Sequence, residues 1–512
     1  NIPLNDPTLV SAHWNGKLDA HLKDKVSEVK LDSRYLFDQG VLSELNLGLS
    51  YFEREKSNLQ YKWNDDYQCA PCGGIVDLPD ALFQVILYPD FLAGQQGHRP
   101  QSWLMLTDVE AYNQTIQNIM VQSGIVPADQ QWNKTVFDPS ASYVNFERSL
   151  SLYTKLKFSG ETALFDWYGN VGARYLYLNN ISDGYFQNIS HISLDPNSSI
   201  NELRLKLTYS DAEQAQAKNH HDYVLFSGSL NFNFLNGFLL KVAGAQVISF
   251  PQIEEIGVNQ KFTSDDSGSV LLSGGNPDLS PYAATQYDLS LEYYADSGNA
   301  LSLTLFNKNI DTYISTTTFE RPFQGDVSAE VLARREQVVE IVNRNENIKG
   351  GSILGAELSA RINLETLCMF CAGFALEANY TRILNNQMSS DPIRLDSVKE
   401  PQSVIEGLSE QSFNWNLSYE NQGFNALLTY SWRSAFLHSR QGIRTGGIPE
   451  HTDALGQLDG RLSYHFSPAF ELFAEAFNLT NEAYLEYADI RSRVTHLEQT
   501  DVNYQLGLRM LW

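Results

Sequence analysis

The amino-acid sequence predicts an all-β protein, a transmembrane antiparallel β-barrel with long loops at one end and short turns at the other. Apolar and polar residues alternate with period two over segments of about 10 to 15 residues, longer than the ~5–6 residues of typical soluble strands. Short and long connections between these segments also alternate along the whole chain. Both features are typical of a barrel whose strands cross a membrane.

The alternation is clearest at the C-terminus. There the even positions hold Val502, Tyr504, Leu506, Leu508, Met510 and Trp512. The odd positions between them are polar or glycine, except Leu511. The same pattern occupies 411–420 and, after a short turn, 424–433. Such segments are strands with one apolar face, and they are long enough for a tilted membrane strand of ~9–11 residues.

The connections predict the strand count. Short turns are expected at 38–40, 159–161, 235–237, 296–298, 364–372, 420–423 and 467–468. Long polar segments lie between them, at about 56–141, 181–220, 250–282, 317–349, 387–410, 435–454 and 481–500. Seven short turns join fourteen strands, and the C-terminal strand is a fifteenth. One further strand would give sixteen, an even number such as a complete porin-like barrel requires, so both counts stay open.

Aromatic residues mark one membrane interface, because they lie beside short turns or the C-terminus. They are Tyr35, Phe37, Phe158, Phe234, Phe238, Tyr419, Phe424, Tyr464, Phe466, Phe470 and Trp512. The polar strand faces place charged side chains in the lumen. These are Arg433, Arg509, Glu471, Glu475, Lys155, Lys157 and Glu292.

Composition excludes several functions. Lys+Arg is 36 and Asp+Glu is 61, a net charge of −25, which argues against nucleic acid as a partner. No apolar run approaches the ~20 residues of a membrane helix. No phosphate-binding or nucleophile motif is present, so we expect no cofactor and no enzyme activity. His220-His221 and Asp265-Asp266, expected in loops, lack the spacing of metal ligands, so no metal site is predicted.

Five segments, in order, resemble one family. They are Gly275 to Pro281 followed by Gln286 to Tyr294, Phe306 to Ile314, Gly355 to Ser359, Asn478 to Tyr484, and Tyr504 to Trp512. Each is a weak motif alone, but together they follow one another in the right order across residues 275–512. They are similar to the barrel of TonB-dependent outer-membrane receptors of Gram-negative bacteria.

The resemblance implies a 22-stranded barrel with an N-terminal plug in its lumen and a short box that contacts TonB. The sequence shows neither plug nor box, so we expect residues 1–512 to be the C-terminal part of such a barrel. The implied partners are the TonB complex through the plug, outer-membrane lipid and lipopolysaccharide, and an extracellular small-molecule ligand. A further implied partner is the barrel assembly machinery, which reads a C-terminal aromatic such as Trp512.

Within the family, the segment from Pro281 to Tyr293 resembles a subgroup linked to oligosaccharide uptake. We therefore favour an oligosaccharide over a ferric siderophore as the imported solute. Two rival functions remain: a complete 16-stranded passive porin, and an outer-membrane hydrolase with its site at the loop rim.

The long segment 56–141 holds the candidate ligand residues. Flat aromatic rings stack on sugar faces and carboxylates accept hydrogen bonds from hydroxyls, which makes a glycan site chemically plausible. The candidates are Trp63, Asp65, Asp66, Tyr67, Trp103, Tyr112 and Trp132. A helix is expected at 105–124, with Thr107 or Asp108 as its N-cap, and 327–343 is also helix-like.

The four cysteines form two C-x-x-C pairs, Cys69/Cys72 and Cys368/Cys371. Local disulfides are the favoured interpretation, and a zinc site made by both pairs stays open.

Overall fold

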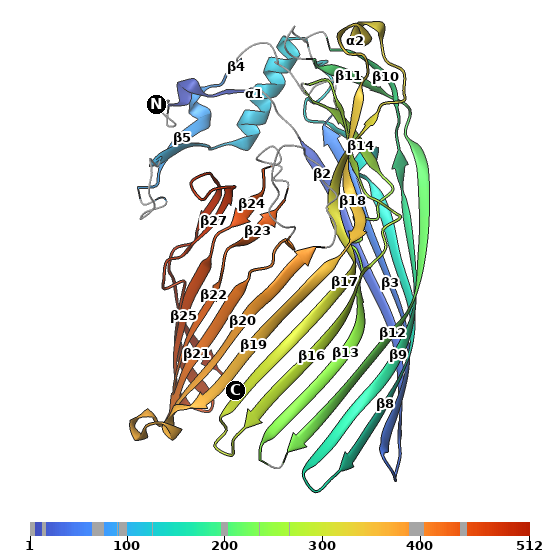
Figure 1. The fold of residues 1–512 in the computed structure, drawn as a ribbon. Coiled ribbons are helices and arrows are strands. Elements are labelled where there is room, and N and C mark those ends of the chain that lie inside the picture. Colours follow the sequence, from blue (N-terminus) through green and yellow to red (C-terminus); the bar gives the residue numbers. More distant parts are fainter. Residues whose placement is uncertain are drawn as a thin grey trace.

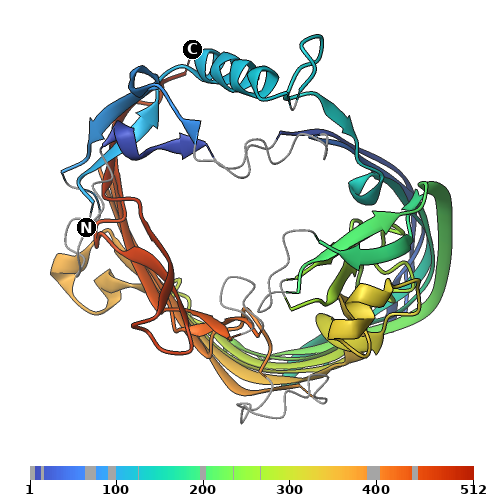
Figure 2. The ribbon, with the colours of Figure 1, turned by 90° about the horizontal axis from the view of Figure 1, so that it is seen from above.

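A computed structural model describes residues 6–12, 17–63, 76–89, 91, 100–124, 126–195, 203–234, 236–265, 267–388, 404–440 and 448–511. In this part of the chain, fifteen long strands follow one another in one antiparallel sheet that curls into a barrel (Figures 1 and 2). They are β2 (Leu18–Leu36), β3 (Leu42–Trp63), β8 (Tyr143–Glu161), β9 (Phe165–Phe186), β12 (Glu213–Phe234), β13 (Phe238–Ser249), β16 (Tyr282–Tyr294), β17 (Ala300–Pro322), β19 (Gly351–Asn363), β20 (Phe374–Met388), β21 (Gln411–Asn421), β22 (Phe424–Arg433), β25 (Leu455–Ser467), β26 (Phe470–Phe477) and β29 (Asn503–Met510). The predicted fold class is confirmed.

The sheet has two end strands. Within the described residues, β2 pairs with β3 alone, from Leu18↔Lys62 to Leu36↔Glu44, and β29 pairs with β26 alone. Both end strands are largely exposed along their whole length, whereas inner strands such as β8 have many buried positions. Each end strand therefore has one edge of backbone N–H and C=O groups with which no described strand pairs.

The short turns occur where the sequence predicts them. They lie at 37–41, 162–164, 235–237, 295–299, 364–373, 422–423 and 468–469, all at the lower end of the barrel in Figure 1. The second turn is about three residues further along than predicted. Gly40, Gly237, Gly298 and Gly373 have positive φ in these turns, a conformation that glycine adopts without strain.

The outer face of the barrel is apolar. Large apolar side chains stay exposed at every second position, for example Leu47 and Leu49 on β3 and Leu303 and Leu305 on β17. Closer to the long loops this face becomes polar. There Arg148 Nε donates to Glu53 Oε2 at 2.7 Å, beyond Leu150 and Leu152 of the same strand. A band of apolar side chains with a polar upper border is what a membrane barrel requires.

The predicted aromatic girdle is present beside the short turns. Its rings pack in pairs across neighbouring strands or along one strand. These pairs are Tyr35–Phe37, Phe165–Phe234, Phe238–Tyr293, Phe374–Tyr419 and Tyr464–Phe466. Trp512 lies outside the described residues.

The inner face carries the predicted charges as ion pairs. Arg461 Nη2 lies 3.0 Å from Glu471 Oε1, and the same guanidinium also binds Glu475. Arg509 Nη1 lies 3.4 Å from the other Glu471 oxygen. Further round the wall, Lys241 pairs with Glu292 and Lys157 with Glu44. Arg433 donates to Ser409 Oγ at 3.0 Å, and Lys155 lies on the same face of β8 as Lys157.

Shorter elements cover the long-loop end. They are α1 (Val109–Gln122), α2 (Ala329–Arg334), β1 (Ser11–Ala12), β4 (Val76–Asp77), β5 (Phe83–Leu87), β6 (Ser102–Leu106), β7 (Thr135–Phe137), β10 (Ile189–Leu194), β11 (Leu205–Tyr209), β14 (Gln260–Ser264), β15 (Val270–Gly274), β18 (Val339–Lys349), β23 (Phe436–Ser439), β24 (Glu450–Thr452), β27 (Ala483–Ala488) and β28 (Val494–Gln499). Among the described residues, no helix is long and apolar enough to cross a membrane.

Several boundaries differ from the prediction. β3, β9, β12 and β17 extend 22 to 23 residues, so much of the predicted loop 181–220 is strand. His220 and His221, expected in a loop, lie within β12 opposite Asn179 and Leu178. The predicted helix at 327–343 is also wrong beyond Arg334, because the β-branched residues after it form β18. Where water wets both faces of a strand, the apolar alternation that reveals it disappears.

A substitution at Gly169 on β9 tests how closely neighbouring strands of the wall are packed. A Cβ there would lie 2.3 Å from the backbone oxygen of Ser229 on β12, so Gly169→Val must displace a paired strand. We expect it to lower the free energy of unfolding by about 1–3 kcal/mol, measured as the urea midpoint in lipid vesicles. Gly228→Val is the control, because its nearest atom would be 3.5 Å away; equal midpoints for the two variants would contradict this packing.

Candidate functional site

The first long loop, residues 76–141, folds into a small unit of its own. Its core holds Leu78, Ile116, Met120, Val126 and Trp132, of which Met120 is fully buried. The predicted helix is confirmed as α1, with Asp108 as its N-cap: the carboxylate accepts a hydrogen bond from Ala111 N–H at 2.9 Å. From above, α1 lies on the side of the ring between the C-terminal end and β2 (Figure 2).

Two of the predicted ligand residues belong to this core. Trp132 is 5 % exposed, and its indole N–H donates to Asn113 O at 3.0 Å. Tyr112 packs against the same cluster, and burial raises the pKa of its phenol. Both rings stabilise the loop unit rather than present a face to solvent.

The third described candidate, Trp103 on β6, lies apart from that core. The rings of Tyr88 and Phe91 pack edge-on against it, with centroids 5.3 Å and 4.6 Å away. Tyr88 and Phe91 are 49 % and 40 % exposed, so they present ring surface to solvent. Trp63 ends β3; its side chain, together with Asp65, Asp66, Tyr67, Cys69 and Cys72, lies outside the described residues.

These aromatic rings face strand β28 across a hollow of about 520 Å³, here called the rim groove. One wall is the end of β5, and the other is β28 and the residues that follow it. The lining residues are Leu87, Tyr88, Pro89, Phe91, Leu497, Glu498, Gln499 and Asp501. The groove lies at the long-loop end, where hairpin β5–β6 and strand β27 occupy the same side of the molecule (Figures 1 and 2).

Carboxylates form the polar border of the rim groove. Gln499 Nε2 donates to Asp501 Oδ1 at 3.2 Å, which fixes that carboxylate beside the groove. His496 Nε2 lies 3.8 Å from Glu498 Oε2. The segment 64–141 carries nine Asp and Glu against two Lys and Arg. The groove therefore combines aromatic rings with hydrogen-bond acceptors in negatively charged surroundings.

A second loop, residues 250–281, folds inward and narrows the lumen. Its core of Ile253, Ile256 and Leu279 packs on Ile314 of β17. Asn145 Nδ2 on β8 donates to Ile253 O at 2.6 Å. Opposite, Asn345 Nδ2 on β18 donates to Glu255 Oε1 at 2.9 Å. This loop, residues 250–281, is here called the inner shelf. Its hydrogen bonds connect it to β8 on one side and to β18 on the other.

Burial changes the acid–base properties of the inner shelf. The pKa of the Glu255 carboxyl is raised by burial. Within the described residues, no group of three or more His, Cys, Asp or Glu side chains is placed to hold a metal ion.

The second cysteine pair lies at the opposite end of the barrel. Cys368 and Cys371 form a disulfide in the 364–373 turn between β19 and β20. The disulfide cross-links the longest of the turns at this end of the barrel and is remote from the long loops.

Comparison with known families decides the identity of this barrel. The model of the TonB dependent receptor-like β-barrel family matches residues 19–479. The chain belongs to this family. Its members are outer-membrane receptors and transporters of Gram-negative bacteria rather than enzymes. In such barrels the long loops are extracellular.

Solved structures share the fold. The unliganded ferric citrate transporter FecA superposes with a TM-score of 0.55 at 11 % identity, over 97 % of this chain and 56 % of FecA. A mutant of the ferric enterobactin receptor PfeA from Pseudomonas aeruginosa gives 0.50 at 12 % identity, over 96 % and 62 %. The ferric-catecholate import receptor Fiu from E. coli K12, in its closed form, gives 0.50 at 11 %, over 96 % and 55 %. The chain thus spans less than two thirds of the length of these receptors. A comparison with curated proteins gave no match.

In this TonB-dependent receptor barrel, the sequence singled out the first long loop as the candidate ligand loop but did not predict the rim groove. Tyr88 and Phe91 flank a Pro-Asp pair, which is a turn signal and gives no indication of a ligand site. Glu498 and Asp501 lie about 400 residues further along the chain, Glu498 in the predicted loop 481–500 and Asp501 directly after it. No local pattern shows that these two loops meet.

Met120 tests whether the first long loop is a folded unit. Met120→Ala removes a fully buried side chain, at a cost of about 2–5 kcal/mol to that unit, and should speed amide hydrogen exchange throughout α1. Met105→Ala, at a side chain that is 49 % exposed, is the matched control. If both variants exchange α1 amides at the wild-type rate, the loop has no such core.

Proposed function

We propose that this barrel belongs to a receptor that captures a bulky, uncharged solute at its extracellular rim for TonB-energised import. An oligosaccharide is the favoured solute class. The observation that carries the proposal is the rim groove, because exposed Tyr88 and Phe91 rings stand beside the Glu498 and Asp501 carboxylates. Sugar rings offer C–H faces to aromatic rings and hydroxyl donors to carboxylates.

Charge separates the two solute classes that the resemblance left open. The solved relatives are named for ferric citrate, ferric enterobactin and ferric catecholates. Chelates of these kinds carry negative charge, and a site for them needs Arg or Lys side chains. The described lining of the rim groove holds two carboxylates and no cation. This supports an oligosaccharide and disfavours an anionic chelate at this position.

Import itself requires parts beyond the fifteen strands. We propose that β2 and β29 pair with further strands to complete a larger barrel, and that a plug in the lumen couples it to TonB. The supporting observation is that each end strand has one unpaired edge, which hydrocarbon does not tolerate. A sixteen-stranded passive porin has less support, because its sheet would have to close on itself.

The remaining partners follow from the proposed place in the membrane. The apolar outer band would lie in outer-membrane lipid, with lipopolysaccharide around its extracellular border. The barrel assembly machinery would insert the strands. Asp and Glu side chains dominate the charge of the chain, which disfavours nucleic acid as a partner.

Binding measurements on the whole receptor, purified from its outer membrane, test the solute class. A library of neutral oligosaccharides should yield a ligand, and Phe91→Ala should weaken it about fivefold, since one aromatic contact contributes about 1 kcal/mol. Phe319→Ala is the matched control, because Phe319 is 41 % exposed against 40 % for Phe91 and lies on β17. Its affinity should equal that of the wild type.

Two results would contradict the proposal. One is tight binding of a ferric chelate together with no binding of any neutral oligosaccharide. The other is an oligosaccharide affinity that Phe91→Ala and Phe319→Ala change equally.

A further inference from the structure

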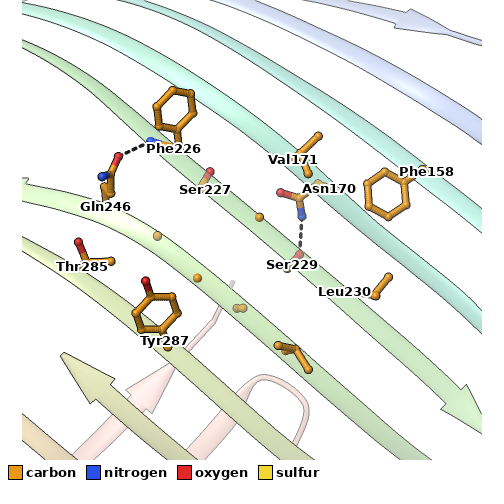
Figure 3. A pocket seen from close by; sticks show the side chains of 15 residues that line it. Phe158, Asn170, Val171, Phe226, Ser227, Ser229, Leu230, Gln246, Thr285 and Tyr287 are labelled. Atoms are coloured by element: carbon orange, nitrogen blue, oxygen red, sulfur yellow. Dashed lines mark hydrogen bonds between the residues drawn. The ribbon is translucent and has the colours of Figure 1, made fainter. Parts of the chain in front are cut away.

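The outer wall has a hollow between β9, β12, β13 and β16, well away from the rim groove (Figure 3). Its volume is about 590 Å³. The side chains around it point to the outside of the barrel, since Val171, Phe226 and Val242 lie on the exposed apolar face, 45–60 % exposed. The hollow is therefore continuous with the surface that contacts lipid.

Glycine creates this hollow. Gly228 on β12 and Gly244 on β13 are direct partners in the sheet, and both lie on the outward face. A Cβ at Gly228 would meet only Asn170 O at 3.5 Å and Val171 Cγ1 at 3.6 Å, both at ordinary contact distance. At Gly228 the backbone does not need glycine for lack of space, so the absent side chain leaves a depression. At Gly244 the Tyr287 ring lies 3.2 Å from where a Cβ would stand and forms one side of that depression.

Strands β12 and β13 also separate beside the hollow, on the side toward the long loops. Pairing between β12 and β13 ends at Ser227↔Ala245, although β12 continues outward as far as Glu213. At the division, Phe226 N–H donates to Gln246 Oε1 at 3.1 Å, so a side chain replaces the missing backbone acceptor (Figure 3). Behind the hollow, Asn170 Nδ2 donates to Ser229 Oγ at 2.6 Å and braces the wall from the lumen side.

The lining changes from polar to apolar along the strands. At the extracellular end lie Gln246, Thr285 and the Tyr287 ring with its hydroxyl (Figure 3). Toward the short turns lie Phe158, Leu230 and Val242. An amphiphile with its head outward and its hydrocarbon inward matches this gradient. The orientation is that of a lipid in the extracellular leaflet.

We propose that this hollow binds one acyl chain of a lipopolysaccharide molecule, with the polar head beside Gln246 and Thr285. An acyl chain lying in the depression beside Gly228 and Gly244 would contact more side chains than one lying on a wall without a depression. Lipopolysaccharide is the lipid of the extracellular leaflet, which is the leaflet that the polar end of the hollow faces.

Native mass spectrometry of the whole protein, extracted from its outer membrane into mild detergent, tests this site. The wild type should retain one lipopolysaccharide molecule, and Gly228→Leu, which fills the hollow, should lower that population at least about fivefold. Ala360→Leu is the matched control, because Ala360 lies opposite exposed Leu301 on the same apolar face, outside the hollow.

A second variant covers a failure of Gly228→Leu to fold: Val242→Phe narrows the same hollow from an exposed position and should have the same effect. Heat-dependent migration in detergent gels checks that each variant is folded. Equal lipid retention in the wild type and the folded hollow-filling variants would overturn the proposal. So would retention of a phospholipid in place of lipopolysaccharide.

Discussion

Backbone hydrogen bonding in hydrocarbon is the constraint on which the rest of this structure depends. A strand in the membrane has no water to satisfy its N–H and C=O groups, so each strand must pair along both edges. In the part of the chain that the structure describes, thirteen inner strands have a paired neighbour on each side, and between β9 and β12 the register is unbroken for twenty-two pairs. The long strands, their tilt and the alternation of apolar and polar residues all follow from this requirement.

The two faces of the wall solve different problems. The outward face meets lipid and holds leucine, valine and aromatic side chains, while the inward face balances its charges locally, as Arg461 does between Glu471 and Glu475. Beyond the membrane both faces meet water, and the loops there need cores of their own. The first long loop and the inner shelf each bury a compact apolar cluster, and this is how they hold polar side chains in fixed places.

Sequence predicted the parts of the fold that repeat a local rule. Alternation located the strands inside the membrane, glycine-containing turns separated them, and Asp108 marked the start of α1. The outer ends of β9 and β12, residues 181–186 and 213–220, were predicted as loop, since residues such as Ser182 and His220 break the alternation where no lipid imposes it. The rim groove escaped for a different reason: Phe91 and Glu498 line one hollow only because the curled sheet brings distant loops together. Long-range proximity of that kind has no local signature.

The most direct test of this account concerns the two end strands. In the protein embedded in its native outer membrane, amide hydrogen exchange is measured for β2 and β29 and compared with the inner strand β16. If each of these strands pairs with a further strand in a larger receptor barrel, their amides should exchange as slowly as those of β16 along the membrane-spanning part. Rapid exchange at every second residue of Leu18–Leu36 or Asn503–Met510 would show free edges and contradict a closed receptor barrel.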